Sequence, residues 1–400
     1  MVQAAVKVGE LATQIRGVTY EKTDASPTPQ PGYLPVLRAG NITDAGLTFE
    51  DLVFVPAARV SDKQKVRRHD VVIAASSGSL DVVGKAAPAL GDFEGGFGAF
   101  CKVLRPNRKV DPSYFAHFFK TQDYRRRISA LAAGININNL RSAHLDELQI
   151  PLPPLAEQRR IAAVLDQAEA LRAKRRATLA LLDSLTKAIF LEMFGDPGTK
   201  PKSWPRLTLD ELIETGPQNG LYKPASDYGS GTRIVRIDAF YDGVVTELAQ
   251  LKRVRVSAAE RAVYALREGD IIVNRVNSME YLGKSAIVPA LDEPTVFESN
   301  MMRFSVRGEL ILPRYAVECL QTASVKRQIL KAAKHAVNQS SINQKDVRSF
   351  ELNVPPLPLQ REFARRVAAV ETLKAAHRAS LAQMDALFAS LQHRAFRGEL

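Results

Sequence analysis

The sequence PPLAEQRRIAAVLDQAEALRAKRRATLALLDSLTKAIFLEMF, at residues 153–194, returns at residues 355–396 as PPLPLQREFARRVAAVETLKAAHRASLAQMDALFASLQHRAF. The two copies align without a gap at an offset of 202, and 16 of the 42 aligned positions are identical. Similarity at one fixed distance along a chain is the signature of an internal repeat. The repeat predicts a globular unit, a long helix, a second globular unit and a second long helix.

Each copy is expected to be helical over nearly its whole length. Proline pairs at 153–154 and 355–356 cannot lie inside a helix, so each helix begins just after them. Gly195 ends the first helix, and Gly398 lies near the end of the second. About 39 residues lie between these limits, which corresponds to roughly 58 Å of helix.

Apolar residues at alternating spacings of four and three predict a coiled-coil seam on both helices. Helix two leaves the unit at which helix one arrives, so the two helices are expected to run antiparallel. Arg175 and His377 fall at the helix midpoints, where they either face each other as a polar layer that fixes the register or lie on a solvated flank. The predicted contacts between the helices are made by Leu171, Arg175, Leu182, Leu185, Leu373, His377, Met384 and Leu387.

The globular units repeat more faintly. The segments 70–74 and 270–274 predict buried strands, and both lead to a Gly-Lys turn at Gly84 or Gly283. Short helices are expected over 112–132 and 313–336. The predicted fold is α+β, with two pseudo-symmetric globular domains separated by an antiparallel two-helix coiled coil. The predicted bounds are 1–152 and 197–354 for the domains, and 153–196 and 355–400 for the helices.

The composition favours a polyanionic partner and excludes several classes of protein. The chain has 400 residues and a net charge of +12 spread over its whole length. Two cysteines are too few for a disulfide framework or a zinc cluster. No apolar run is long enough to span a membrane and no signal-peptide core is present, so an intracellular, cytoplasmic protein is expected.

The sequence predicts neither catalysis nor a cofactor. His-Glu-x-x-His and Cys-x-x-Cys motifs are missing, and Ser278 stands where a phosphate loop requires its first glycine. The segments that differ most between the two units are instead rich in Asn, Gln, Ser and Arg, which read base edges and phosphates. Ordinary loop drift after duplication would also explain any one of these differences.

The residues predicted to contact DNA lie in those segments and beside them. In the first unit they are Arg38, Asn41, Ser76, Ser77, Ser79, Lys85, Asn136 and Asn138. In the second unit they are Arg236, Asn274, Arg275, Asn277, Ser278, Lys284, Gln339, Ser340 and Asn343.

The residues 151–158 (PLPPLAEQ), followed by Ile161 and Leu165, and the ending Phe194-Gly-Asp-Pro resemble the specificity subunit of type I restriction-modification systems. The resemblance extends over essentially the whole chain. Leu359 replaces, in the second copy, the glutamate found at Glu157, so a role for that carboxylate would not transfer to the second site.

This resemblance implies that each globular unit is a target recognition domain that reads one half of a bipartite, asymmetric double-stranded DNA site. The helix pair would set the spacing between the halves. Two N6-adenine methyltransferase (modification) subunits would dock on the chain, and restriction/translocase subunits would join them. One alternative is a coiled-coil adaptor that binds proteins without selecting a DNA sequence. Another, the recognition region of a single-chain restriction-methylation enzyme, is disfavoured because no catalytic motif flanks it.

Overall fold

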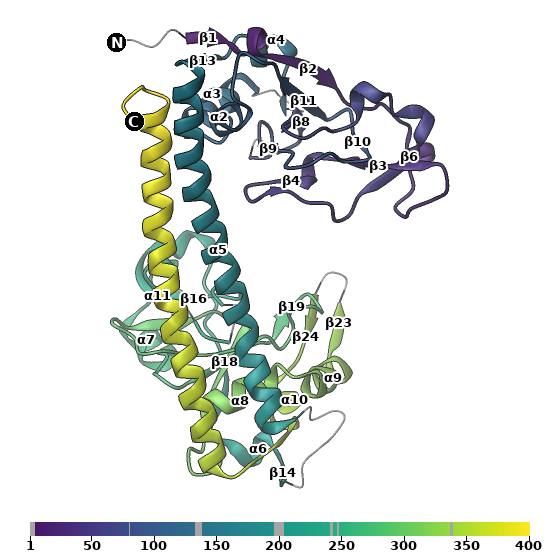
Figure 1. Cartoon of the computed structure of the whole chain (residues 1–400). Helices are drawn as coiled ribbons and strands as arrows, with labels where there is room; N and C mark the ends of the chain where they lie inside the picture. The colour runs from purple at the N-terminus through teal and green to yellow at the C-terminus, as the bar shows by residue number, and fades with distance from the viewer. Residues whose placement is uncertain are drawn as a thin grey trace. The chain divides into compact units, whose positions relative to one another are not determined.

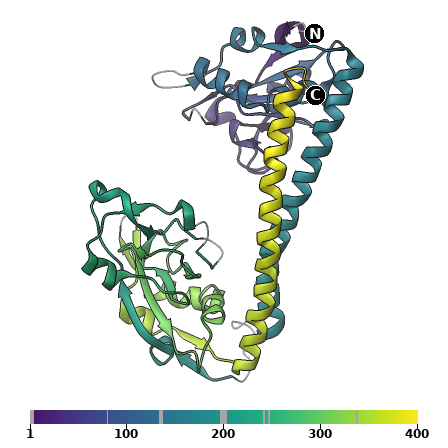
Figure 2. The same cartoon turned by 90° about the vertical axis from the view of Figure 1, so that its left-hand side faces the viewer.

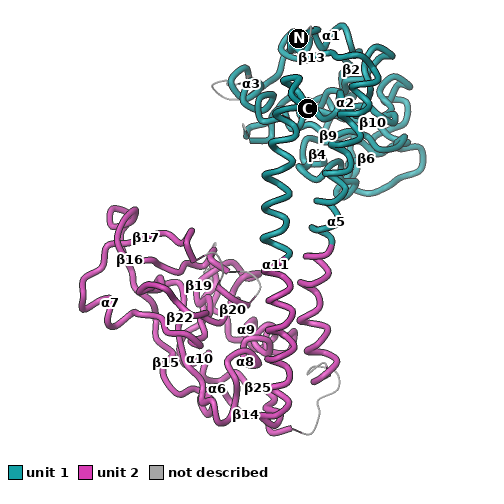
Figure 3. The backbone as a smooth tube through the Cα atoms, turned by 60° about the vertical axis from the view of Figure 1, so that its left-hand side comes forward, with its two compact units in different colours: residues 1–177, 377–400 teal, residues 178–376 magenta. Residues whose placement is uncertain are grey.

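The computed structural model divides the chain into two compact units (Figure 3), and it describes residues 5–79, 81–132, 138–195, 204–240, 243–245, 248–336 and 339–400. Unit 1 comprises Met1–Ala177 and His377–Leu400, and unit 2 comprises Thr178–Ala376. Each unit therefore contains one globular part together with about half of each long helix.

The two long helices are α5 (Leu155–Phe194) and α11 (Leu357–Ala395), which begin directly after the proline pairs. They lie side by side in both views (Figures 1 and 2). In unit 1 an early part of α5 contacts a late part of α11, through Arg172 and Asp385. In unit 2 the late part of α5 contacts the early part of α11, through Asp183 and Lys374. The helices are antiparallel, as the connectivity predicted.

A buried glutamine fixes the start of each long helix in the same way. Oε1 of Gln158 accepts a hydrogen bond from the backbone N–H of Asp111 at 2.8 Å, and its Nε2 donates to the carbonyl of Pro153 at 2.8 Å. Gln360 repeats this arrangement in unit 2, with Leu312 and Pro355 as partners, each at 2.8 Å. The glutamine of the repeated motif thus ties each helix to its own globular part.

Replacing this glutamine should destabilise unit 1. In Gln158→Ala the buried backbone groups of Asp111 and Pro153 lose their partners, and we expect a loss of about 2–3 kcal/mol in the free energy of unfolding. Urea denaturation of the full chain measures it. Arg159→Ala is the control, because Arg159 is the exposed neighbour; equal losses in both variants would contradict the role given to Gln158.

The seam between the helices is more polar than the sequence predicted. Arg172 pairs with Glu169 on its own helix at 2.8 Å and with Asp385 on α11 at 2.6 Å. The repeat-equivalent residue Lys374 pairs in the same way with Glu371 at 3.3 Å and with Asp183 at 2.8 Å. Two equivalent ion-pair clusters therefore hold the helices together, one in each unit.

Arg175 and His377, which are equivalent to each other in the repeat, are hydrogen-bonded partners in unit 1: the guanidinium of Arg175 donates to Nδ1 of His377. Leu182 packs against the core of unit 2, and Met384 is half-buried. The four remaining leucines predicted for the seam are instead exposed, to between 39% and 58%: Leu171, Leu185, Leu373 and Leu387. The residue that follows each of these leucines points into the seam instead. These four residues are Arg172, Thr186, Lys374 and Phe388.

The globular part of unit 1 is built on a four-stranded antiparallel sheet in the order β2-β11-β7-β9, beside a three-stranded sheet in the order β10-β3-β6. Two-stranded pairs β1-β13, β4-β5 and β8-β12 complete it. The strands are β1 (Ala5–Lys7), β2 (Ala12–Arg16), β3 (Tyr33–Leu37), β4 (Ile42–Thr43), β5 (Gly46–Leu47), β6 (Val53–Pro56), β7 (Val71–Ala74), β8 (Ser76–Ser77), β9 (Ala86–Pro88), β10 (Gly96–Phe97), β11 (Cys101–Pro106), β12 (Asn138–Asn139) and β13 (Gln149–Pro151). The helices are α1 (Val8–Leu11), α2 (Pro112–Phe118), α3 (Gln122–Ala132) and α4 (Ser142–Asp146).

Unit 2 repeats this plan, with sheets in the orders β15-β22-β18-β20 and β17-β16-β21, the pair β14-β25, and a three-stranded sheet β19-β24-β23. The strands are β14 (Arg206–Thr208), β15 (Ile213–Asn219), β16 (Tyr228–Val235), β17 (Arg253–Val254), β18 (Ile271–Asn274), β19 (Val276–Asn277), β20 (Ser285–Ile287), β21 (Thr295–Phe297), β22 (Met301–Val306), β23 (Lys334–Ala336), β24 (Gln339–Ser341) and β25 (Glu351–Asn353). The helices are α6 (Leu209–Leu212), α7 (Ala258–Tyr264), α8 (Pro313–Leu320), α9 (Ala323–Ala332) and α10 (Gln344–Arg348). The predicted α+β duplication is confirmed.

The four-stranded sheet of unit 1 is covered on both faces, which explains why its inner strand β7 is wholly apolar. In β7, Val71 and Ile73 pack with Tyr114 of α2 and Leu165 of α5. Val72 faces the opposite way and packs with Phe97 of β10. The long helix is thereby part of the core of the unit.

The predicted short helices are each divided in two. At each division a threonine hydroxyl accepts a hydrogen bond from the backbone N–H three residues later. Thr121 accepts from Tyr124 in unit 1, and Thr322 accepts from Val325 in unit 2. Such a bond starts a new helix. In unit 2 the predicted helix also ends early, because residues 334–336 form β23.

Candidate nucleic-acid interface

Two segments of unit 1 that were singled out for their polar side chains form one small strand pair. β8 pairs with β12, with Ser77 opposite Asn138 and Ser76 opposite Asn139. Ser76 and Ser77 are half-buried, and Ser79 just beyond them is exposed. Asn136 lies outside the described residues, and Asn138 is placed by its backbone alone.

The equivalent segments of unit 2 form a three-stranded sheet. β19 pairs with β24, with Asn277 opposite Ser340, and β24 also pairs with β23. Gln339 and Lys334 are exposed at this sheet, and Asn277 is half-buried. We call these elements the recognition strands: β8 and β12 in unit 1, and β19, β23 and β24 in unit 2.

Equivalent backbone hydrogen bonds hold the recognition strands in both units, and we call this arrangement their backbone frame. In unit 1 the carbonyl of Phe100 accepts from the N–H groups of residues 75 and 76, at 2.8 and 3.1 Å. In unit 2 the carbonyl of Asn300 accepts from those of residues 275 and 276, at 2.8 and 3.2 Å. An identical frame therefore presents different polar side chains in the two units.

A Gly-Lys turn returns the chain from each set of recognition strands to the central sheet. Gly84 has a φ of +78°, and a Cβ added there would lie 2.1 Å from Cγ2 of Ile128 on α3. Gly283 is equivalent, with a φ of +77° and Ile329 in the role of Ile128. Both positions require glycine, so the Gly-Lys sequence is explained by the geometry of the turn and not by phosphate binding.

The lysines of these turns differ in environment. Nζ of Lys85 pairs with Asp44 at 3.4 Å. Nζ of Lys284 donates to the carbonyl of Ile237 at 2.7 Å and lies 4.7 Å from the ring centroid of Phe240. Burial lowers the pKa of Lys284.

Arginines directly follow the equivalent strands β3 and β16, as Arg38 and Arg236. Arg38 is exposed and donates to the carbonyl of Asp51 at 2.6 Å. Nε of Arg236 lies 3.3 Å from Glu298, and burial raises the pKa of that carboxyl group. Arg275 donates to the carbonyl of Ser299 at 3.1 Å, and Ser278 is exposed.

Four of the predicted contact residues have local structural roles or are buried. The amide of Asn41 accepts from the N–H of Arg38 and donates to the carbonyl of Glu50, at 2.8 and 2.7 Å. Asn343 caps α10, accepting from the N–H groups of Lys345 and Asp346 at 2.8 and 3.0 Å. Asn274 is 0% exposed and Ser340 only 4%. The same side-chain chemistry suits turns, caps and bases, so composition alone did not separate these roles.

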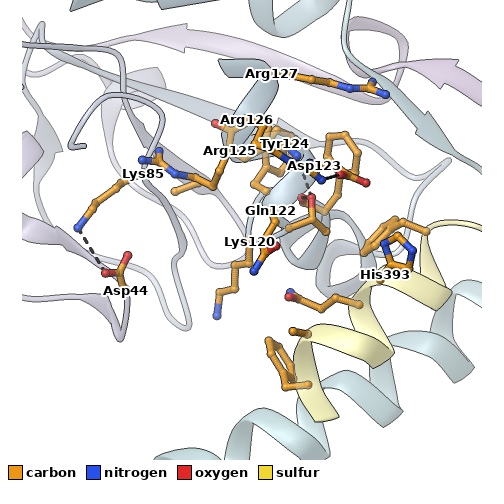
Figure 4. A pocket seen from close by; sticks show the side chains of 18 of the residues that line it. Asp44, Lys85, Lys120, Gln122, Asp123, Tyr124, Arg125, Arg126, Arg127 and His393 are labelled. Atoms are coloured by element: carbon orange, nitrogen blue, oxygen red, sulfur yellow. Dashed lines mark hydrogen bonds and ion pairs between the residues drawn. The ribbon is translucent and has the colours of Figure 1, made fainter. Parts of the chain in front are cut away.

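Sequence reasoning missed a pocket of about 590 Å³ in unit 1, lined by α3, the turn around Lys85 and the last turns of α11 (Figure 4). One difference between the two copies could have indicated this pocket: Gln392 on α11 occupies the position that is Phe190 in the first copy. Elsewhere, the described residues contain no group of His, Cys, Asp and Glu side chains that could hold a metal ion. None of the described helices is long and apolar enough to cross a membrane.

The two units thus present different polar side chains from equivalent backbone frames. Comparison with known proteins identifies the class: the family model for the type I restriction modification DNA specificity domain matches residues 4–180 and 201–383. The chain belongs to this family. Its relatives are named as specificity subunits of type I restriction enzymes.

Two such relatives match over nearly their full length. The specificity subunit of the type I restriction enzyme EcoKI from Escherichia coli (strain K12) is 33% identical over 410 residues, covering 98% of this chain and 88% of that protein. That of StySPI from Salmonella potsdam is 33% identical over 413 residues, covering 99% and 89%. The crystal structure of a type I S subunit from M. genitalium has the same fold, with a TM-score of 0.56 at 15% identity over 98% of this chain and 96% of the other.

Proposed function

We propose that this specificity subunit reads a bipartite, asymmetric double-stranded DNA site, with one half read by the recognition strands of each unit. The observation that carries the proposal is the identical backbone frame with different side chains: Ser76 and Ser77 in unit 1, Asn277 and Gln339 in unit 2. Amide and hydroxyl groups on a strand pair suit base edges. Arg38, Lys85, Arg236, Lys284 and the neighbouring Lys334 supply the charge for phosphates.

The helix pair would fix the distance between the two half-sites. α5 has 40 residues, about 60 Å of helix, and its ion-pair clusters fix its register against α11. DNA half-sites read from one side lie a helical turn, about 34 Å, or a multiple of it apart.

The exposed leucines of the helix pair would receive the methyltransferase subunits. Leu171 and Leu373 are equivalent in the repeat, and so are Leu185 and Leu387. Unit 1 therefore has one pair of exposed leucines, and unit 2 has its equivalent. What supports this docking site is the repetition of the exposed leucines at equivalent positions, because two equivalent sites fit two methyltransferase subunits. Restriction/translocase subunits then join this complex, which works on DNA in the cytoplasm.

The experiment that tests the proposal is mapping of N6-methyladenine in the host genome with and without this gene. We expect one bipartite asymmetric motif to lose methylation on deletion. A mobility-shift assay with the methyltransferase complex tests the adaptor alternative. An adaptor would bind cognate and scrambled duplexes equally, whereas a specificity subunit would prefer the cognate duplex.

Gln339→Ala should relax the specificity of the half-site read by unit 2. A bidentate side-chain contact to a base is worth about 1–3 kcal/mol, so we expect the preference for the cognate base pair to fall by about tenfold to a hundredfold. Competition binding with duplexes altered in one half-site measures it. Gln344→Ala is the matched control, an exposed glutamine at the start of α10; unchanged discrimination in Gln339→Ala would remove this residue from the interface.

A further inference from the structure

The pocket of unit 1 has an apolar floor and a basic rim. The half-buried ring of Phe396, just beyond the end of α11, lines it, and the buried rings of Tyr124 on α3 and Phe388 on α11 lie behind. Lys120 and Arg127 line it as well, and neither forms an ion pair with the residues that the structure describes. Its volume of about 590 Å³ falls within the range of small-molecule sites.

The other charges of the pocket are largely matched. Lys85 pairs with Asp44, Arg126 with Asp123, and Arg172 with Glu169 and Asp385. Figure 4 shows Lys120 pointing into the open space beside Lys85 and Asp44. The surplus positive charge therefore comes from Lys120, Arg125 and Arg127, and the N-terminus of the 11-residue helix α3 adds to it.

A buried polar group points to a ligand. Gln392 is 7% exposed, it lines the pocket, and its Nε2 has no hydrogen-bond partner among the described residues. Leaving such a donor buried and unpaired is costly, and it is rare in folded proteins. A hydrogen-bond acceptor in the pocket would remove that cost.

The repeat shows that the fold does not require these residues. At the position of Gln392, the first copy has Phe190, which stacks on Tyr315 with ring centroids 5.8 Å apart and belongs to the core of unit 2. The residue equivalent to Lys120 in unit 2 is Gln321, which likewise precedes the capping threonine of the next helix. Arg125, by contrast, bonds to carbonyls of the turn at 81–83, as Lys326 does in unit 2, and is structural. Gln392 and Lys120 are thus specific to this pocket.

We propose that the pocket of unit 1 binds a nucleotide. The ring of Phe396 takes the base by stacking, the amide of Gln392 bonds to the base edge, and Lys120 with the start of α3 takes the phosphate. A nucleotide combines the flat ring, the hydrogen-bond acceptor and the negative charge that these groups fit. The site contains no residue of the recognition strands, although it shares Lys85 with the proposed DNA interface.

Calorimetric titration of the full chain with adenosine 5′-monophosphate tests the proposal. We expect saturable binding, weakened about tenfold in Lys120→Gln, which removes one charged hydrogen bond. Gln392→Phe should abolish binding, because it restores the aromatic side chain that the other copy carries. Lys109→Gln, an exposed lysine outside the pocket, should bind as the native chain does.

Several results would overturn the proposal. These are no binding by the native chain at millimolar nucleotide, unchanged binding in Gln392→Phe, and inorganic phosphate binding as tightly as the nucleotide. Competition with a short DNA duplex then shows whether the pocket takes a free nucleotide or a nucleotide within DNA. Displacement of a fluorescent nucleotide, lost in Gln392→Phe, identifies a nucleotide within DNA, whereas retention of the bound nucleotide identifies a free one.

Discussion

The chain carrying Leu171→Glu, Leu185→Glu, Leu373→Glu and Leu387→Glu should bind no methyltransferase subunit while remaining folded. All four side chains are exposed, so the glutamates cost the isolated chain little. In a complex each would place a charge in an apolar contact, which weakens association by about a hundredfold or more. Loss of N6-adenine methylation should follow.

The repeat allows a sharper form of this experiment. Leu171→Glu/Leu387→Glu alters only the leucines of unit 1, and Leu185→Glu/Leu373→Glu alters only those of unit 2. Each double variant should bind one methyltransferase subunit in place of the two proposed for the native chain, measured as the mass of the complex by light scattering. Leu90→Glu/Val263→Glu is the matched control, since both residues are exposed apolar side chains outside the helix pair. Two bound subunits on the quadruple variant would refute the docking surface.

These leucines also show where sequence reasoning reaches its limit. The proline pairs and the connectivity of the repeat correctly predicted two long antiparallel helices, whereas the spacing of apolar residues was used to predict the seam between them. It placed Leu171 and Leu373 in the seam, one position away from Arg172 and Lys374, which occupy it. A long basic side chain buries its aliphatic stem while its charge meets a carboxylate across the seam. An apolar pattern cannot distinguish a leucine that faces a partner helix from one that faces another subunit.

The candidate interface was predictable for a different reason. Two segments about 60 residues apart in each unit diverged between the copies, and the structure brings them together as paired strands. Divergence between the two copies therefore located the strands. Residue type alone did not separate the proposed DNA-contacting residues from asparagines with a structural role. Asn41 and Asn343 have the chemistry of base-reading side chains, yet their amides are bonded to the backbone.

The second large effect is expected where β7 begins, at the ion pair between Asp70 and Arg105. The Asp70 side chain is 1% exposed, and it accepts from Nε and Nη2 of Arg105 at 2.8 and 2.7 Å. Arg105→Met leaves this carboxylate buried without its countercharge, and we expect unit 1 to lose about 3–5 kcal/mol of stability. Hydrogen exchange of the amides of β7 and β11 in the full chain measures the loss locally. Asp70→Asn/Arg105→Met should recover most of it, because the double variant buries no unpaired charge.

Unit 2 provides the matched control, because its equivalent pair is looser. Asp270 and Arg303 are 3.6 Å apart, and burial raises the pKa of Asp270 above its usual value of 3.8. A raised pKa means that the stabilising contribution of Asp270 is complete below about pH 3.8 and is lost as the pH rises through the raised value. Asp270→Asn, which can still accept from the N–H of Arg267, should therefore cost less than about 1 kcal/mol at pH 7 and abolish this pH dependence. Equal losses in Arg105→Met and Asp270→Asn would show that burial of the unpaired charge does not control the stability of β7.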